Sequence, residues 1–353
     1  MNISEGVLRG YLLEEALAKL VKNSGYNLIT TKVLSNPNSN PEFTLRSNGL
    51  NIKGRGGIHQ ADVLGQFPFS LPFTYPVRLF LEAKFRNSRT GIDVIRSGIG
   101  ILQDLNSNYQ TIDLDGQDLL AQRYNYQYAI FSTSGFSDNA IKLAIAHKIH
   151  LIDLSGKEYE GLRNIIKETA QIIYNQKQNY SLNDIRQVIR NEFFRVTLDK
   201  GVQRNQELRK MLREYFNYFR NFGDLYLAST NSPFTILLKP SSSKHFKNFL
   251  EHTRRTTFYV NITWNDDENR HYWIISINDL QNVTFSFALP TLLAEYIFNQ
   301  QTKDHQLSSA LDAKRQYFNN IIFYLRDLEQ FITLKYIMPD LKQRNSQEPS
   351  YRK

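Results

Sequence analysis

The stretch Leu79-Phe80-Leu81-Glu82-Ala83-Lys84 places two charged side chains in an apolar run that is typical of a buried strand. Alternate residues of a strand point to the same face, so Glu82 and Lys84 project together. A second such segment, His59-Gln60-Ala61-Asp62-Val63, lies shortly before it, and an adjacent strand could bring Asp62 beside the other two. Two carboxylates and one ammonium on one face suit a hard divalent cation and an activated water.

A plainer interpretation of these three charges is a surface strand with a cross-strand salt bridge. Their apolar flanks argue against it, because an unpaired buried carboxylate is very costly. Charged residues inside buried strands are rare unless they are paired or functional. The sequence therefore favours a functional site at Asp62, Glu82 and Lys84.

Composition excludes several classes of protein. The chain has 353 residues, enough for two domains, and contains no cysteine, which rules out disulfide scaffolds, thiolate zinc sites and cysteine nucleophiles. The seven histidines show no HExxH spacing. No apolar run approaches the length of a membrane span, and the first residues do not resemble a secretory signal. We therefore expect a cytoplasmic protein without a membrane partner.

The basic excess lies mostly in the second half of the chain. The net charge is +9, with 15 basic and 13 acidic residues over 1–156 and 28 and 21 over 157–353. A basic surface attracts polyanions such as DNA. Many soluble proteins carry this charge without binding one, so charge alone does not decide the function.

Hydrophobic periodicity predicts an α/β layer in the first half. Helices are expected at 6–25, 91–105 and 137–147, and strands at 26–33, 58–67, 77–85, 126–132 and 149–154, with a loop at 34–51. Strands interleaved with helices indicate a sheet that is at least partly parallel. The pattern changes after Gly156, where helices are expected at 158–177, 181–222, 292–300 and 307–337 and paired strands at 257–264 and 271–277. We expect two domains, 1–156 and 157–353, the second α+β and mainly helical.

Several segments of the first half follow one another in a recognisable order. Glu82-Ala83-Lys84 matches a (D/E)-x-K element, with Asp62 as the upstream acid, although no proline precedes Asp62. Residues 129–140 look like a strand, a small polar turn and a helix, and 144–153 like a closing strand. On these segments, residues 1–156 resemble the PD-(D/E)XK nuclease superfamily, in particular its Mrr-like restriction endonuclease branch.

The first helix offers a fourth acid. The Mrr-like branch tends to carry a glutamate that faces the metal site, several turns before a Gly-aromatic pair, which is Gly25-Tyr26 here. At about 100° per residue, Glu14 lies at the edge of the apolar face beside Val21, while Glu15 points roughly opposite. We expect Glu14 at the site and Glu15 in solvent. A solvated position for Glu14 is the alternative.

The resemblance implies a restriction-endonuclease-like core, a mixed sheet flanked by helices. It further implies a Mg²⁺-dependent endodeoxyribonuclease, with Mn²⁺ as a substitute, that hydrolyses phosphodiester bonds in restriction or antiphage defence. Asp62, Glu82 and the backbone carbonyl of Ala83 would hold the metal. Lys84 would orient or deprotonate water or neutralise the phosphate, and Glu14 would complete the metal shell.

Supporting roles are open for four further residues near the motif. Gln60 is either a polar group near the metal or a structural hydrogen-bonding residue. His59 is either structural or faces DNA. Arg86 and Arg89 follow the motif strand and either contact phosphates beside the scissile bond or form a solvated turn.

The second half leaves its role open. Arg186 and Arg190 belong to a basic series that either tracks DNA or forms an exposed helical face. The aromatic residues of the paired strands are either base-stacking groups or, more commonly, core: Phe258, Tyr259, Trp264, Tyr272 and Trp273. This half could bind DNA, sense a signal or form a homo-oligomer or a complex with a partner defence protein. Rival functions are a nuclease-fold DNA-binding protein that does not cut and an assembly protein.

Overall fold

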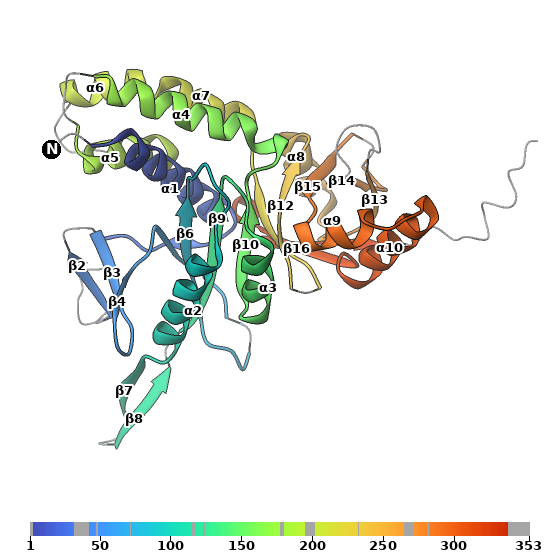
Figure 1. Cartoon of the computed structure of the whole chain (residues 1–353), viewed down its shortest axis with the longest axis horizontal. Coiled ribbons are helices and arrows are strands. Elements are labelled where there is room, and N and C mark those ends of the chain that lie inside the picture. Colours follow the sequence, from blue (N-terminus) through green and yellow to red (C-terminus); the bar gives the residue numbers. More distant parts are fainter. Residues whose placement is uncertain are drawn as a thin grey trace, which may run out of the picture. The chain divides into compact units, whose positions relative to one another are not determined.

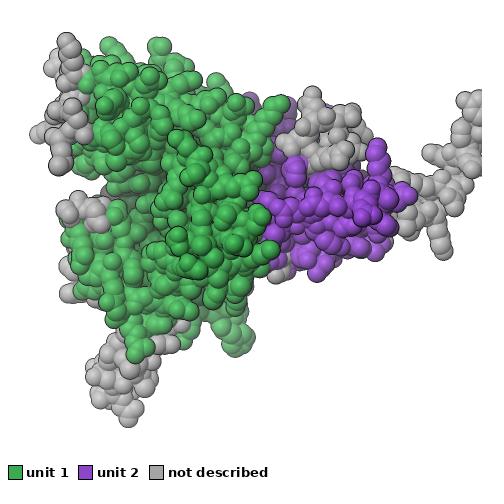
Figure 2. Space-filling model, in the orientation of Figure 1, with its two compact units in different colours: residues 1–227, 235–237, 324–330 green, residues 228–234, 238–323, 331–353 purple. Residues whose placement is uncertain are grey.

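The computed structural model of the chain describes residues 3–31, 42–46, 49–70, 72–114, 117–122, 124–176, 180–194, 202–231, 233–264, 271–280 and 282–337. The chain divides into two compact units (Figure 2). Unit 1 comprises residues 1–227, 235–237 and 324–330, and unit 2 comprises 228–234, 238–323 and 331–353. Among the described residues, no helix combines the length and the apolar character needed to cross a membrane.

Unit 1 is built on a mixed five-stranded sheet (Figure 1). Its order is β1 (Asn27–Leu28), β5 (Val63–Gln66), β6 (Val77–Lys84), β9 (Asn125–Ser132) and β10 (Ile149–Asp153). Strands β6, β9 and β10 are parallel, and β1 and β5 are antiparallel to their neighbours. Parallel neighbours need crossover connections, which here contain the helices α2 (Ile92–Asn106) and α3 (Asp138–Ala146). The predicted α/β class is therefore confirmed.

Helices cover both faces of this sheet. Leu79 and Leu81 of β6 belong to the same buried cluster as Leu17 of α1 (Glu5–Asn23). On the opposite face, Phe80 stacks on Tyr128 at 5.0 Å between ring centroids. A Cβ added to Gly98 of α2 would lie 3.1 Å from the Tyr128 ring, so α2 packs closely there. The alternation of β6 thus directs its odd and even residues to different helices.

The predicted strand at 58–67 is in fact two strands in two sheets. β4 (Ile58–Gln60) joins a second sheet with β2 (Phe43–Arg46) and β3 (Gly49–Lys53), whereas β5 pairs with β6. Asp62 lies at the break between them. The expected loop at 34–51 was wrong where β2 and β3 form, and residues 32–41 lie outside the described residues. A separate hairpin joins β7 (Tyr109–Leu114) and β8 (Gln117–Gln122).

Four helices after the sheet also belong to unit 1: α4 (Glu160–Tyr174), α5 (Leu182–Phe194), α6 (Val202–Met211) and α7 (Arg213–Phe222), which follow the short turn η3 (Lys157–Tyr159). Ile166, Ile185 and Tyr215 share the buried cluster of α1. The Tyr215 hydroxyl donates to the Leu12 carbonyl at 2.7 Å. The change of pattern after Gly156 therefore lies within a compact unit, because these helices complete the cover of α1.

Unit 2 contains most of a closed seven-stranded barrel. Its strand order is β11 (Tyr226–Ser229), β12 (Thr235–Pro240), β15 (Thr284–Ala288), β14 (Tyr272–Ile277), β13 (Thr257–Trp264), β17 (Gln330–Tyr336) and β16 (Asn320–Leu325). Its helices are α8 (Ser243–Thr253), α9 (Thr291–Phe298) and α10 (Lys303–Gln316), and the turn η4 (Arg326–Leu328) joins β16 to β17. The helix expected over 307–337 was wrong beyond Gln316, where β16 and β17 form instead.

The aromatic alternation of the paired strands serves packing for the most part. Phe258 and Trp273 are buried, whereas Tyr259 is exposed. Trp264 stacks on Trp273 with ring centroids 5.5 Å apart, and the Tyr272 hydroxyl is hydrogen-bonded to Ser286 at 2.7 Å. These contacts support the core interpretation over base stacking for all but Tyr259.

A lysine buried beside the two tryptophans predicts a pH dependence of stability. The Nζ of Lys314 lies 4.7 Å from the Trp264 ring centroid and 5.4 Å from that of Trp273. Burial lowers the pKa of Lys314 from 10.5 to about 8. Between these values the unfolded chain binds the proton more readily than the folded one, so the free energy of unfolding should rise with pH from about 8 to 10.5.

Lys314→Met should remove this dependence and raise the stability of unit 2 at pH 7 by at most about 3 kcal/mol. Urea unfolding at several pH values, followed by tryptophan fluorescence, measures this stability directly, because both tryptophans of the chain contact Lys314. Other groups titrate in this range, so the slope of the variant is the control. Equal slopes in wild type and variant would contradict the prediction.

Candidate functional site

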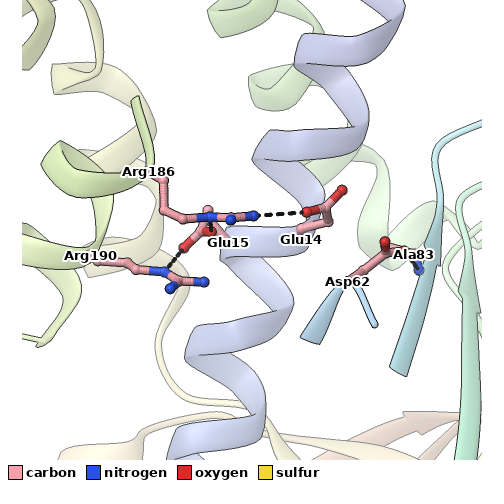
Figure 3. Close-up of polar contacts among 6 residues, drawn as sticks. All are labelled: Glu14, Glu15, Asp62, Ala83, Arg186 and Arg190. Atoms are coloured by element: carbon pink, nitrogen blue, oxygen red, sulfur yellow. Dashed lines mark hydrogen bonds and ion pairs between the residues drawn. The ribbon is translucent and has the colours of Figure 1, made fainter. Parts of the chain in front are cut away.

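Asp62 is fixed to the edge of β6 by two hydrogen bonds. Its backbone N–H donates to the Leu81 carbonyl at 3.2 Å. Its Oδ2 accepts from the Ala83 N–H at 2.7 Å (Figure 3). Asp62 lies at the break between β4 and β5, and both its backbone and its carboxylate are hydrogen-bonded to β6. The antiparallel pairing of β5 with β6 thus places Asp62 beside the (D/E)-x-K segment.

Glu82 and Lys84 form an ion pair on one face of β6. Their side chains are 20 % and 22 % exposed, so the pair is partly covered but open to solvent. The Tyr128 hydroxyl donates to Glu82 Oε2 at 2.5 Å. Tyr128 is fully buried and therefore limits the orientations of Glu82. The sequence did not single out Tyr128, because it lies inside an apolar strand without a motif.

Glu14 lies close enough to Asp62 for the two carboxyl groups to interact. Burial, and next the Asp62 charge, raise the pKa of Glu14 to about 8, although Arg186 opposes this. Burial also raises the pKa of Asp62. The Ala83 N–H lowers it, and Glu82 raises it further. Glu14 of α1 thus interacts with Asp62 at the β4–β5 break, and Asp62 interacts with Glu82 of β6.

The expected position of Glu15 was wrong. Glu15 is 1 % exposed, and its two carboxylate oxygens accept from the Nε groups of Arg186 and Arg190, each at 2.7 Å (Figure 3). Arg186 also reaches Glu14 at 3.3 Å. The helical-wheel prediction failed because α5 packs against α1 and this side of the helix is covered too: Leu8, Leu12 and Ala18, which lie beside Glu15 on the helix, are buried as well. Arg186 and Arg190 accordingly lie in internal ion pairs and not on an open helical face.

His59 holds the second sheet to α2. Its Nε2 lies 2.7 Å from Asp104 Oδ2, and the same carboxylate accepts from the N–H groups of Gly56 at 2.6 Å and Gly57 at 3.0 Å. Burial raises the pKa of Asp104, but these hydrogen bonds outweigh it and leave the pKa below its usual value. A Cβ at Gly54 would lie 1.9 Å from Asp104 Oδ2. The arrangement supports the structural role for His59.

The remaining candidates lie at the surface around the site. Gln60 is exposed at the end of β4 and lines the same pocket as Asp62. Arg86 and Arg89 are exposed just after β6, and Arg89 forms a loose ion pair with Asp138 at 3.9 Å. Both arginines are therefore accessible to a large ligand that approaches the Lys84 end of the strand.

The donors at the site match Mg²⁺ in their chemistry. Carboxylate oxygens from Asp62, Glu82 and Glu14 and the Ala83 carbonyl are hard ligands of the kind that Mg²⁺ binds. Burial, and next the repulsion of a neighbouring carboxylate, raise the pKa values of Glu14 and Asp62, and a cation would relieve that repulsion. Within the described part of the chain, no three His, Asp or Glu side chains are already grouped to hold a metal ion.

Comparison with known proteins identifies no family. No protein-family model matches the chain, and no curated protein matches it. The chain is similar to the crystal structure of AF1548, a protein of unknown function, at 17 % sequence identity and a TM-score of 0.32. The similarity covers 59 % of this chain and 96 % of that chain. At this TM-score the likeness supports no conclusion about fold or function.

Proposed function

We propose that this protein is a metal-dependent DNA endonuclease with a restriction-endonuclease-like core in unit 1. The observation that carries the proposal is the Asp62 carboxylate, hydrogen-bonded to the Ala83 N–H, between the Glu82 and Lys84 positions of the adjacent strand. An acid joined in this way to a (D/E)-x-K strand provides both metal ligands and a cation at one place. A role in restriction or antiphage defence follows from the resemblance of residues 1–156, and we place it in the cytoplasm as the composition suggests.

The side chains of the site have distinct roles in this proposal. Asp62, Glu82 and the Ala83 carbonyl would hold Mg²⁺, with Glu14 completing its shell. When bound, the ion supplies Lewis-acid stabilisation and lowers the pKa of water. Lys84 orients the attacking water or neutralises the scissile phosphate. Tyr128 keeps Glu82 in position through its hydrogen bond, in the way that outer groups orient metal ligands.

Plasmid cleavage tests the proposal. Supercoiled DNA should be nicked or linearised with Mg²⁺ or Mn²⁺ and left intact with EDTA. Asp62→Ala and Glu82→Ala should each abolish cleavage, because each removes a metal ligand. His59→Ala is a suitable comparison, since His59 contacts Asp104 instead of the acids of the site. Cleavage that survives both acid substitutions would show that the site is assigned wrongly. Binding without any cleavage would favour the non-cutting DNA-binding protein.

A further inference from the structure

A pocket of about 70 Å³ in unit 1 has Asp62 in its wall together with Arg186 and Arg190 of α5. The rest of the wall comes from α1, the segment 28–31, β3 and residues 60–64. A water molecule needs roughly 10–15 Å³ of such space, so the pocket has room for a group of several oxygen atoms. It therefore places two guanidinium groups next to an acid of the proposed catalytic site.

Arg190 has most of its hydrogen-bonding capacity to spare. A guanidinium carries five N–H donors. Arg190 uses its Nε for Glu15, and among the described residues its terminal amino groups have no acceptor. Its side chain is 26 % exposed. Glu15 therefore fixes the orientation of Arg190 through its Nε and leaves the two terminal amino groups of the guanidinium accessible.

The chemistry of this pocket favours an oxyanion. The free edge of a guanidinium binds phosphate through two parallel hydrogen bonds. Glu15 is one buried carboxylate with two arginines at its oxygens, so these three side chains carry a net charge of +1. Glu14, 3.3 Å from Arg186, offsets this charge on the Arg186 side when it is ionised. Asp62 opposes an anion from the same wall, but its Oδ2 is held by the Ala83 N–H. An anion would therefore bind against Arg190, next to the Asp62 carboxylate but not in contact with it.

We propose that Arg190, aided by Arg186, binds a backbone phosphate of the DNA substrate that neighbours the phosphate at Asp62. This inference rests on the proposed function, because it takes the Asp62 site as the place of the scissile phosphate. The subsite anchors the strand next to the reacting bond. Its two arginines come from α5, outside residues 1–156.

The salt dependence of DNA binding tests the subsite without cleavage. The full chain is titrated into a fluorescent duplex with EDTA present, at several salt concentrations. Each lost phosphate contact should reduce the slope of log affinity against log salt by about 0.9. Arg190→Gln should show this loss and bind about 10-fold more weakly. Arg209→Gln, which alters an exposed arginine of α6, should change neither quantity.

Further arms separate the alternatives. Arg190→Lys keeps a cation beside Glu15, so it should fold, retain the slope and bind more weakly than wild type. Wild-type binding by both Arg190 variants, or an equal loss in Arg209→Gln, overturns the proposal. Inorganic phosphate that stabilises the wild type but not Arg190→Gln, with equal DNA binding by both, also overturns it and assigns the pocket to a free oxyanion. If the protein cuts no DNA but its salt slope of DNA binding still depends on Arg190, the result supports the phosphate subsite and refutes the proposed endonuclease activity.

Discussion

Lys84→Met is expected to slow Mg²⁺-dependent plasmid cleavage by about 10²- to 10⁴-fold while the protein stays folded. The substitution keeps the length of the aliphatic chain and removes the cation that we place at the attacking water or the phosphate. Folding should survive because an ion pair as exposed as that of Lys84 with Glu82 contributes about 1 kcal/mol or less. Initial rates of nicking, together with a thermal melt, measure both effects.

Arg86→Met is the matched control for Lys84→Met. It removes a charge of the same sign two residues further along, at an exposed position, and should slow cleavage far less. If both variants lost the same activity, a general loss of DNA attraction would explain the result, and Lys84 would have no special role. A larger deficit in Lys84→Met at saturating DNA would place the effect in the chemical step.

Glu15→Ala should destabilise unit 1 by about 3–5 kcal/mol, because it leaves Arg186 and Arg190 without their shared buried carboxylate. In a unit of this size the melting temperature would fall by about 10 °C. Hydrogen exchange should show the loss first in α1 and α5, which the ion pairs join. Circular dichroism melts give the magnitude.

The neighbouring acid provides the comparison for Glu15. Glu14→Ala removes a carboxylate whose burial is itself costly, so the free energy of unfolding should change little. Replacing Glu15, Arg186 and Arg190 together by Leu, Met and Met should recover much of the stability lost in Glu15→Ala, since apolar groups need no partner. Equal destabilisation by Glu14→Ala and Glu15→Ala would contradict the role of the buried ion pairs.

The sequence alone was sufficient to place a side chain where the repeat of its own helix or strand determines which face it occupies. Glu82 and Lys84 share a face because a strand alternates, and their ion pair reflects that spacing. Glu14 was placed near Asp62 by the helical repeat together with the resemblance. Glu15 was misplaced for a physical reason: its partners lie 171 and 175 residues away. No local pattern reports such a contact.

Missing turn signals explain the error over 307–337. The segments 320–325 and 330–336 are rich in β-branched and aromatic residues, which favour strands. The turn between them has Glu329 at a φ of 51°, a position where glycine or asparagine is usual. Without a glycine or proline to mark the turn, the run was interpreted as one helix. The roles of Tyr128 and of Asp104 also depended on tertiary contacts alone.

The contacts between α1 and the helices α5 and α7 have a consequence for the order of events in folding. Tyr215 reaches the Leu12 carbonyl across 203 residues, so α1 is synthesised long before the helices that cover it and must wait for them. Loops of this length are slow to close, and non-local contacts are associated with slow folding. Refolding of unit 1 should therefore be limited by the docking of α5 and α7 on α1. A nascent chain released near residue 156 would expose the apolar face of α1 and the Glu15 carboxylate, which makes it a target for chaperones and proteases.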